Sequence, residues 1–260
     1  AEIGNIGNFP ATALYDFCNA FPTLLDEWMW LVLNVLGLPK HIRNVISCLY
    51  TAITAFSSGC GDCTFLFHVL GGVRTGCPLS SILFLLGINP FVELVLFLSD
   101  NPGLSITRIC ADDFGSSLKA LKTLQIQASI FDLTRRCAGL HLKPCKCVLI
   151  ISGVRLTEHL KLCIREWLRI NVPQFADFLI EESGKFLGWM LGQNSTALSF
   201  KAPIKKYVQR VQEVCSGGAP AAPSIVRYNQ RALSVLSYVA QFVEPPKDLG
   251  LAAIAHRSIH

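Results

Sequence analysis

A long apolar segment, residues 81–98 (SILFLLGINPFVELVLFL), restricts the possible folds of this chain more than any other stretch. It approaches the ~20 apolar residues that a membrane-spanning helix needs. Asn89, Pro90 and Glu93 lie near its centre. A charge at mid-bilayer costs roughly 2.5 kcal/mol or more, and proline suits a helix start or a kink better than an unbroken span. We therefore expect a buried core helix, with a transmembrane helix as the alternative.

The composition is that of a folded chain. Apolar residues make up 51% of the 260 residues and charged residues only 16%, with a mean hydropathy of +0.43. This excludes a disordered chain, and the length allows one sizeable core or two modest lobes. No basic stretch precedes an apolar run and a small-residue cleavage site at the N-terminus, so we expect no signal peptide and an intracellular protein.

The cysteines indicate reduced thiols. There are 11 of them, an odd number, scattered along the chain, which fits buried thiols of an intracellular protein better than disulfides. A zinc site is the alternative, because Cys60 and Cys63 form one pair and Cys145 and Cys147 another. A structural zinc site needs two well-spaced pairs, and only one residue separates the second pair.

Strands and helices alternate over residues 12–192, which predicts an α+β or α/β lobe, and a smaller helical lobe follows. Expected strands are 12–16, 65–70, 104–110, 114–118 and 147–152, with a glycine-punctuated hairpin at 186–192. Expected helices are 25–36, 40–56, 79–98, 119–137, 203–214 and 224–243. Phe21–Thr23 should break the first strand, residues 57–63 should form a turn, and 216–223 should form a flexible or extended link.

This arrangement of strands makes three acids candidates for a metal site. The strand 12–16 ends at Asp16, and the strands on either side of Asp112 and Asp113 form a hairpin with both acids at its tip. An isolated Asp-Asp pair on a turn is usually solvated. Adjacent carboxylates in a partly buried site repel each other unless a cation lies among them. Two Mg²⁺ ions, roughly 3.5 to 4 Å apart, would hold the attacking and leaving oxygens of a displacement at phosphorus.

Five blocks in a fixed order carry a resemblance. They are residues 16–22 (DFCNAFP), 72–80 (GVRTGCPLS), 111–113 (ADD), 139–146 (GLHLKPCK) and 186–192 (FLGWMLG). In order, spacing and residue identity, this set resembles the reverse transcriptase domain of non-LTR (LINE-type) retrotransposons. The similarity covers about residues 12–192 and is far more specific than any single block.

The resemblance implies an α+β fold of the right-hand polymerase type. Residues 1–192 would form the palm, an antiparallel sheet with packed helices and remnant fingers, and residues 193–260 a small helical thumb with a C-terminal tail. Only fifteen residues precede Asp16, so the fingers would be mostly missing. Either the chain is a fragment of a larger open reading frame, or the gene is a degraded copy.

The resemblance also assigns catalytic roles. Asp16 and Asp112 would be the metal-binding carboxylates for two Mg²⁺ or Mn²⁺ ions, with Asp113 as the third acid and metal ligand of the hairpin. Lys146 matches the lysine that neutralises or protonates the leaving pyrophosphate. Phe21 resembles the aromatic side chain that stacks under the incoming sugar and rejects a 2′-hydroxyl, and simple core packing is its alternative role.

The nucleotide and the nucleic acid would contact further residues. Arg74, Thr75 and Gly76 belong to the loop that lies against the incoming nucleotide, and the family most often has glutamine at the position of Thr75. Leu187 and Gly188 match the turn that grips the primer end. Basic residues on the following helix would track the phosphates of a primer–template duplex, although such a face is often merely solvated. They are Lys205, Lys206 and Arg210.

The expected function is that of an RNA-directed DNA polymerase. Its partners would be an RNA template, a DNA primer and dNTPs, in the nucleus or the cytoplasm and without stable membrane association. The net charge of +5 is consistent with a nucleic-acid partner. Two alternatives remain open at this point. One is a catalytically inactive palm that binds nucleic acid or a protein, and the other is a small membrane protein built around residues 81–98.

Overall fold

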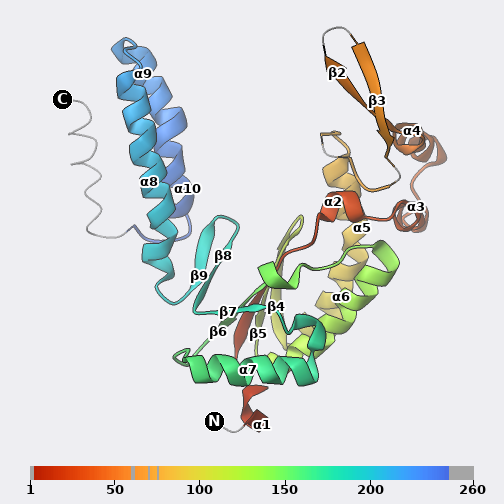
Figure 1. The fold of residues 1–260 in the computed structure, drawn as a ribbon, viewed down its shortest axis with the longest axis vertical. Helices are drawn as coiled ribbons and strands as arrows, with labels where there is room; N and C mark the ends of the chain where they lie inside the picture. The colour runs from red at the N-terminus through yellow and green to blue at the C-terminus, as the bar shows by residue number, and fades with distance from the viewer. Residues whose placement is uncertain (1–2, 60–61, 70, 75, 246–260) are drawn as a thin grey trace. The chain divides into compact units, whose positions relative to one another are not determined.

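The computed structural model describes residues 3–59, 62–69, 71–74 and 76–245 (Figure 1). Within this part the chain forms two compact units. The first contains the residues up to 149 together with 153–180, and the second contains 150–152 and the residues from 181 onward. The boundary predicted at residue 192, between a palm and a thumb, is a different division from these two units and stays a prediction.

A five-stranded sheet in the order β4-β5-β1-β6-β7 organises the fold. Its strands are β1 (Ala11–Tyr15), β4 (Ser105–Cys110), β5 (Asp113–Leu118), β6 (Val148–Ile151) and β7 (Leu179–Glu181). β5 is antiparallel to both of its neighbours, β4 and β1. Four predicted strands are confirmed to within a residue or two, and the fold is of the α+β class. The strand β7 was not expected from the sequence.

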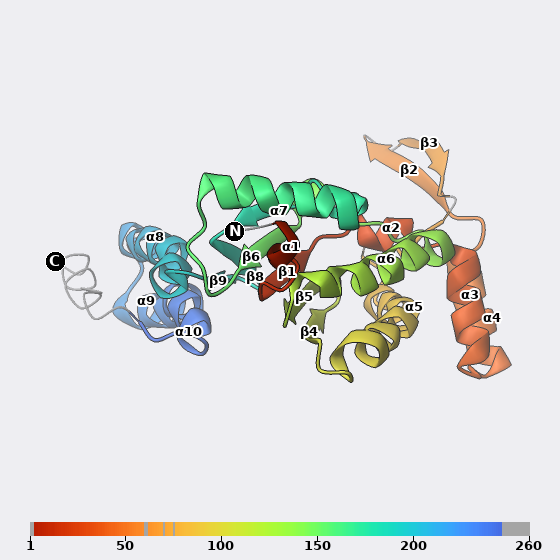
Figure 2. The same ribbon diagram turned by 90° about the horizontal axis from the view of Figure 1, so that it is seen from below.

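The apolar segment forms a helix that buries one face in the first unit, while Ile82 and Leu85 are exposed. α5 (Ser80–Val95) packs against α3 (Asp26–Val35) and α6 (Leu124–Ala138), and Figure 2 shows α5 and α6 lying side by side. Phe84, Ile88 and Phe91 on its inner face are almost fully buried. In the described residues one helix, Ser80–Asp100, is long and apolar enough to cross a membrane by length and composition.

Buried aromatic side chains join the sheet to α6. Tyr15 on β1 contacts the rings of Phe114 and Phe131, and its buried hydroxyl donates a hydrogen bond to Gln127 on α6. Gln127 Nε2 in turn donates to Ser116 Oγ on β5 at 2.7 Å. Because an unpaired polar group in a core is costly, this buried chain of hydrogen bonds favours one relative position of β1, β5 and α6.

Two predictions between residues 40 and 68 are wrong. The helix predicted over 40–56 ends earlier, as α4 (Lys40–Tyr50), and its last part belongs to a strand, β2 (Thr54–Gly59). β2 pairs antiparallel with β3 (Asp62–His68), so the predicted turn at 57–63 is mostly strand. Residues 54–59 are a strand because they pair with β3, where Phe56 lies opposite Phe65. The helical spacing of apolar residues carries no information on such contacts between strands, so the sequence pattern predicted a helix.

Further helices complete the first unit. α7 (Glu158–Asn171) was not expected from the sequence, and its N-terminus is capped by Thr157, which accepts a hydrogen bond from the Leu160 N–H. The short helix α2 occupies the predicted strand break at 21–23, and β1 has ended at Tyr15. The remaining short elements are α1 (Ile3–Ile6), α2 (Ala20–Thr23), η1 (Leu96–Asp100), η2 (Leu121–Thr123), η3 (Pro144–Lys146) and η4 (Pro173–Phe175).

The second unit combines a hairpin with a helical bundle. The hairpin is β8 (Ser183–Phe186) and β9 (Trp189–Gly192), which are antiparallel. The helices are α8 (Ser195–Ser216), α9 (Ala221–Arg227), η5 (Tyr228–Leu233) and α10 (Ser234–Ala240). Their core includes Phe200, Tyr207 and Leu236. The predicted helices are present, but α8 begins before the expected start at Pro203, and α9 begins inside the expected link.

Candidate active site

The register of the sheet brings the predicted acids together. The last pair of the β1–β5 ladder is Tyr15 with Phe114. Strands in this ladder are antiparallel, so the next residue of β1 and the preceding residue of β5 lie opposite each other, and these are Asp16 and Asp113. Residues that face each other across an antiparallel pair have Cα atoms about 5 Å apart. Asp16 and the acidic hairpin therefore share one end of the sheet.

The hairpin itself has the predicted form. β4 and β5 close with the pair Cys110 and Asp113, which leaves Ala111 and Asp112 as a two-residue loop. Ala111 has a φ of 55°, in the left-handed region that tight hairpin turns need and that costs a non-glycine residue some strain. The turn places Asp112 at the tip and Asp113 at the start of the strand.

Asp113 shows that the carboxylates interact. Its pKa is raised above the usual value of 3.8, first by loss of hydration and then by the negative charges of Asp112 and Asp16. Repulsion of this kind is what a divalent cation relieves. The three acids therefore share one electrostatic environment, as the sequence predicts.

Lys146 lies beside Asp16. Its Nζ is 3.7 Å from Asp16 Oδ2, which is an ion pair too long for a hydrogen bond. Within the described residues Asp16 Oδ2 is buried and has no hydrogen-bond partner. A buried carboxylate oxygen without a donor is costly, so this atom is suited to receive a cation.

Backbone hydrogen bonds hold the Lys146 segment against β1. The Lys143 N–H donates to Asp16 O at 2.8 Å, and the Cys18 N–H donates to His141 O at 2.9 Å. The buried Cys147 thiol accepts from the Asp16 N–H at 3.3 Å, and burial raises its pKa to about 12. Cys147 is thus a neutral structural residue, and among the described cysteines it alone is buried as the sequence predicts, the others being partly or fully exposed.

The donor chemistry of the site fits hard cations, although the ligands are not gathered. Carboxylate oxygens suit Mg²⁺ or Mn²⁺, and Asp16 Oδ2 accepts no hydrogen bond within the described residues. Across the part of the chain that the structure describes, however, no three His, Cys, Asp or Glu side chains converge as a metal site. The cysteines considered for zinc do not form such a group in the described residues either. Cys63, Cys145 and Cys147 form no disulfide, and Cys60 lies outside the described residues. Rotation of the acidic side chains would be needed to close the site around an ion.

Phe21 lies on α2, where its ring is engaged in packing. It stacks on Phe84 of α5 with a centroid distance of 4.5 Å and remains partly exposed. Its backbone carbonyl accepts a hydrogen bond from the Val73 N–H at 2.8 Å. Both roles considered for Phe21, packing and contact with a sugar, are compatible with this position.

The glycine-rich loop lies directly against α2 at Gly72. Gly72 has a φ of 83°, and a Cβ there would lie 2.1 Å from Pro22 O, so only glycine fits. Arg74 donates from Nη1 to Gly71 O at 2.8 Å. Its Nε and Nη2, the edge that binds phosphate side-on, are buried and unpartnered within the described residues. Gly76 has a φ of 91° and open space around it, and Thr75 lies outside the described residues.

The predicted primer and template residues belong to the second unit. Leu187 and Gly188, with φ of 47° and 92°, form the turn between β8 and β9, and Tyr238 donates to Leu187 O at 2.6 Å. Lys205 and Lys206 are exposed on α8. Arg210 instead donates to the carbonyl oxygen of Arg231, a basic residue to which sequence reasoning gave no role.

Comparisons with known proteins reveal similarity only to solved structures. No protein-family model matches the sequence, and no curated protein matches it. Apo telomerase from Candida tropicalis is similar at a TM-score of 0.53 and 10% identity, over 97% of this chain and 46% of that one. The likeness is one of fold. A form of the same telomerase truncated from the C-terminal domain has a TM-score of 0.51 and 14% identity, over 71% of this chain and 34% of that one.

The chain thus has a telomerase-like fold and spans less than half the length of either telomerase. This agrees with the polymerase fold predicted from the five sequence blocks, since telomerase is related to reverse transcriptases. The roles of individual residues are not decided by a likeness of fold.

Proposed function

We propose that this chain is part of an RNA-directed DNA polymerase of a non-LTR (LINE-type) retrotransposon. It would transfer a nucleotidyl group from a dNTP to the 3′ end of a primer. The observation that carries the proposal is the β1–β5 register, which sets Asp16 opposite the start of the acidic hairpin, in a chain with a telomerase-like fold. The order of the five sequence blocks supports the retrotransposon type.

Asp16, Asp112 and Asp113 are the proposed ligands of two Mg²⁺ or Mn²⁺ ions. When bound, such ions stabilise the charge on the attacking and leaving oxygens of phosphoryl transfer. Asp16 Oδ2, which accepts no hydrogen bond within the described residues, supports this assignment. So does the raised pKa of Asp113, which burial and the neighbouring charges of Asp112 and Asp16 cause. The protein contributes the fixed backbone positions from which these carboxylates extend.

Lys146 is the proposed partner of the leaving pyrophosphate. Its ammonium group is near Asp16 but not hydrogen-bonded to it, and the side chain is largely exposed. It can therefore turn toward an anionic leaving group and neutralise or protonate it.

Contacts to the nucleotide and the duplex complete the proposal. The buried, unpartnered edge of Arg74 supports a phosphate contact in the loop that also contains Thr75 and Gly76, and Phe21 would contact the sugar. The turn at Leu187 and Gly188 would contact the primer end. Phosphates of the RNA template and DNA primer would be tracked by basic residues of α8, and the enzyme would work in the nucleus or the cytoplasm. These basic residues are Lys205, Lys206 and Arg210.

Primer extension tests the proposal. The purified protein, a primed RNA template, dNTPs and Mg²⁺ or Mn²⁺ should give extended primer, and Asp112→Ala or Asp16→Ala should abolish extension. Asp177→Asn is the matched control, because Asp177 is an exposed carboxylate of the first unit. Extension that survives in Asp112→Ala would refute the proposed chemistry.

Metal binding can be tested without activity. A ligand that binds only the folded state raises its stability, so MgCl₂ should raise the melting temperature of the wild type more than an equal ionic strength of NaCl does. The increase should be lost in Asp16→Ala and retained in Asp177→Asn. Equal shifts in both variants would show that the ions do not bind at the acids.

Two other results would favour the alternatives. If the protein shifts RNA in a gel but extends no primer, it is an inactive palm that binds nucleic acid. If the protein stays in the membrane fraction after an alkaline wash, the helix Ser80–Asp100 inserts into the bilayer and the polymerase proposal fails. The burial of Phe84, Ile88 and Phe91 in the first unit favours release by the wash.

A further inference from the structure

One cleft of the first unit contains none of the residues proposed for the reaction. It has a volume of about 350 Å³ and lies between the start of α3, the end of α4 and the β2–β3 hairpin. Its lining includes Asp26, Trp30, Tyr50, Thr51 and His68. The volume is in the range of small-ligand sites, roughly 300 to 1,000 Å³, and three of these side chains carry aromatic rings.

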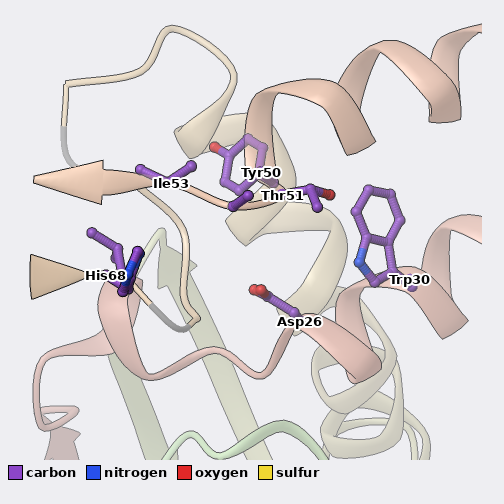
Figure 3. Close-up of a pocket in the computed structure, with 8 residues that line it drawn as sticks. Asp26, Trp30, Tyr50, Thr51, Ile53 and His68 are labelled. Carbon is purple, nitrogen blue, oxygen red and sulfur yellow. The ribbon is translucent and has the colours of Figure 1, made fainter.

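Asp26 is the one carboxylate in the lining. In Figure 3 it points into the space between His68 and Trp30, below Tyr50 and Thr51. Its Oδ1 accepts a hydrogen bond from the Gly72 N–H at 3.1 Å, which fixes the orientation of the group. The pKa of Asp26 is raised, mainly by loss of hydration. A partly dehydrated acceptor of this kind gains from a donor that replaces water.

The surroundings define the shape and charge of a fitting ligand. Trp30 and His68, on either side of Asp26, offer ring surfaces on which a flat molecule can stack, whereas the Tyr50 ring is buried. Glu27 adds negative charge near Asp26, and Arg74 opposes it. Tyr50 is held in place by its hydroxyl, 3.2 Å from Ser80 Oγ, with the Arg74 guanidinium 5.6 Å from its ring centroid. A planar ligand with hydrogen-bond donors on one edge matches these features.

We propose that this cleft binds a guanine base, stacked against its aromatic wall, with the Asp26 carboxylate accepting from N1–H and the 2-amino group. Guanine presents these two donors side by side on its Watson–Crick edge. Adenine, cytosine and uracil have no two neighbouring donor groups on that edge, so a carboxylate placed the same way would meet at least one acceptor. The choice of a nucleobase rests on the proposed function. The base can belong to a free nucleotide or to unpaired RNA, which proteins often read by stacking and edge contacts.

Calorimetric titration without divalent ions or dNTPs tests this proposal independently of polymerisation. GMP should bind, and IMP, which lacks only the 2-amino group, should bind at least about tenfold more weakly because one charge-assisted hydrogen bond is lost. AMP should bind more weakly still. A uridine-rich RNA strand with one guanosine, compared with the same strand carrying inosine, tests the RNA source in the same way.

The variant Asp26→Asn distinguishes recognition from a structural role. Asn keeps an oxygen for the Gly72 N–H but replaces the other oxygen with a donor. Binding of GMP should fall at least about tenfold, and XMP, which has a carbonyl in place of the 2-amino group, should become the preferred nucleotide. Asp177→Asn, at an exposed site of the same unit, should keep the wild-type order.

Several results would overturn the proposal. They are equal affinities for GMP and IMP, absence of guanine-dependent binding in both the nucleotide and the RNA experiments, and an unchanged order of GMP and XMP in Asp26→Asn. If primer extension occurs and these results are obtained, the cleft proposal alone fails. If guanine-specific binding is found and extension is absent, the proposed catalysis fails while the cleft proposal stands.

Discussion

Nζ of Lys146 lies 3.7 Å from Oδ2 of Asp16, although the two residues are far apart in the sequence. The contact depends on the backbone hydrogen bonds that align residues 141–143 with 16–18. It joins a flexible cation to the central carboxylate of the candidate active site. An ion pair this exposed contributes little to stability.

Lys146→Ala should slow nucleotide addition by about 10²- to 10⁴-fold, the range for loss of a general acid. Folding should be unaffected, because Lys146 is largely exposed. Single-turnover primer extension measures the effect. Lys143→Ala is the matched control, since the backbone of Lys143 makes the contact to Asp16 and its side chain is exposed. If both variants lose the same activity, Lys146 has no special role in the reaction.

Asp113→Asn should stabilise the metal-free protein near neutral pH. The pKa of Asp113 is raised above 3.8 in the folded state by loss of hydration and by the charges of Asp112 and Asp16. The folded state therefore holds this proton more tightly than the unfolded state. The penalty for ionising it is absent below the unfolded pKa and fully present above the folded pKa.

The expected gain for Asp113→Asn is below about 1 kcal/mol, because solvent screens the exposed group. Thermal unfolding at about pH 7 and about pH 4 without divalent ions measures it. The advantage of the variant should shrink toward the lower pH. A variant that is less stable than the wild type at the higher pH would show that the ionised Asp113 is favourably bound.

Gly72→Ala should destabilise the first unit by about 3 kcal/mol, because backbone strain and a steric clash coincide. Its φ is 83°, and the new Cβ would lie 2.1 Å from Pro22 O. Urea denaturation gives the loss. Gly103→Ala separates the two causes, since Gly103 has a φ of 70° with nothing within 4 Å, and it should cost only about 1 kcal/mol. Equal losses would mean that the loop moves away from α2.

Phe21→Val should lower the preference for dNTPs over rNTPs by about tenfold or more, if the ring excludes a 2′-hydroxyl. The ratio of the two kcat/KM values is the measurement. Phe84→Leu is the control, because it removes the ring that stacks on Phe21 and should reduce stability without changing the ratio. A ratio unchanged in Phe21→Val would leave packing as the role of Phe21.

Local patterns were sufficient for several elements. The apolar runs before Asp16 and on both sides of Asp112 and Asp113 predict β1 and the β4–β5 hairpin within a residue or two. The core helix α5 follows from its hydrophobicity. These elements form where strand or helix preference, turn residues and burial all agree.

Other elements depended on distant partners. The chain after Tyr50 becomes a strand because β3 pairs with it, and no local periodicity contains that information. The cleft around Asp26 could not be predicted for the same reason, since its residues come from α3, α4 and β3. The Gly72 N–H that orients Asp26 belongs to yet another segment.

The sequence by itself determined the candidate residues: acids at the ends of apolar strands, a glycine-rich loop, and a lysine in one of the five ordered blocks. Only the tertiary structure decided which of them lie near one another: Lys146 lies beside Asp16, and the charge of Asp16 acts on Asp113. The register of Tyr15 with Phe114 sets Asp16 opposite Asp113, and the buried bonds from Tyr15 through Gln127 to Ser116 support that register. Slipping β1 by one residue would turn its buried side chains to the other face of the sheet, so packing of the whole core, and not local propensity, selects the geometry of the site.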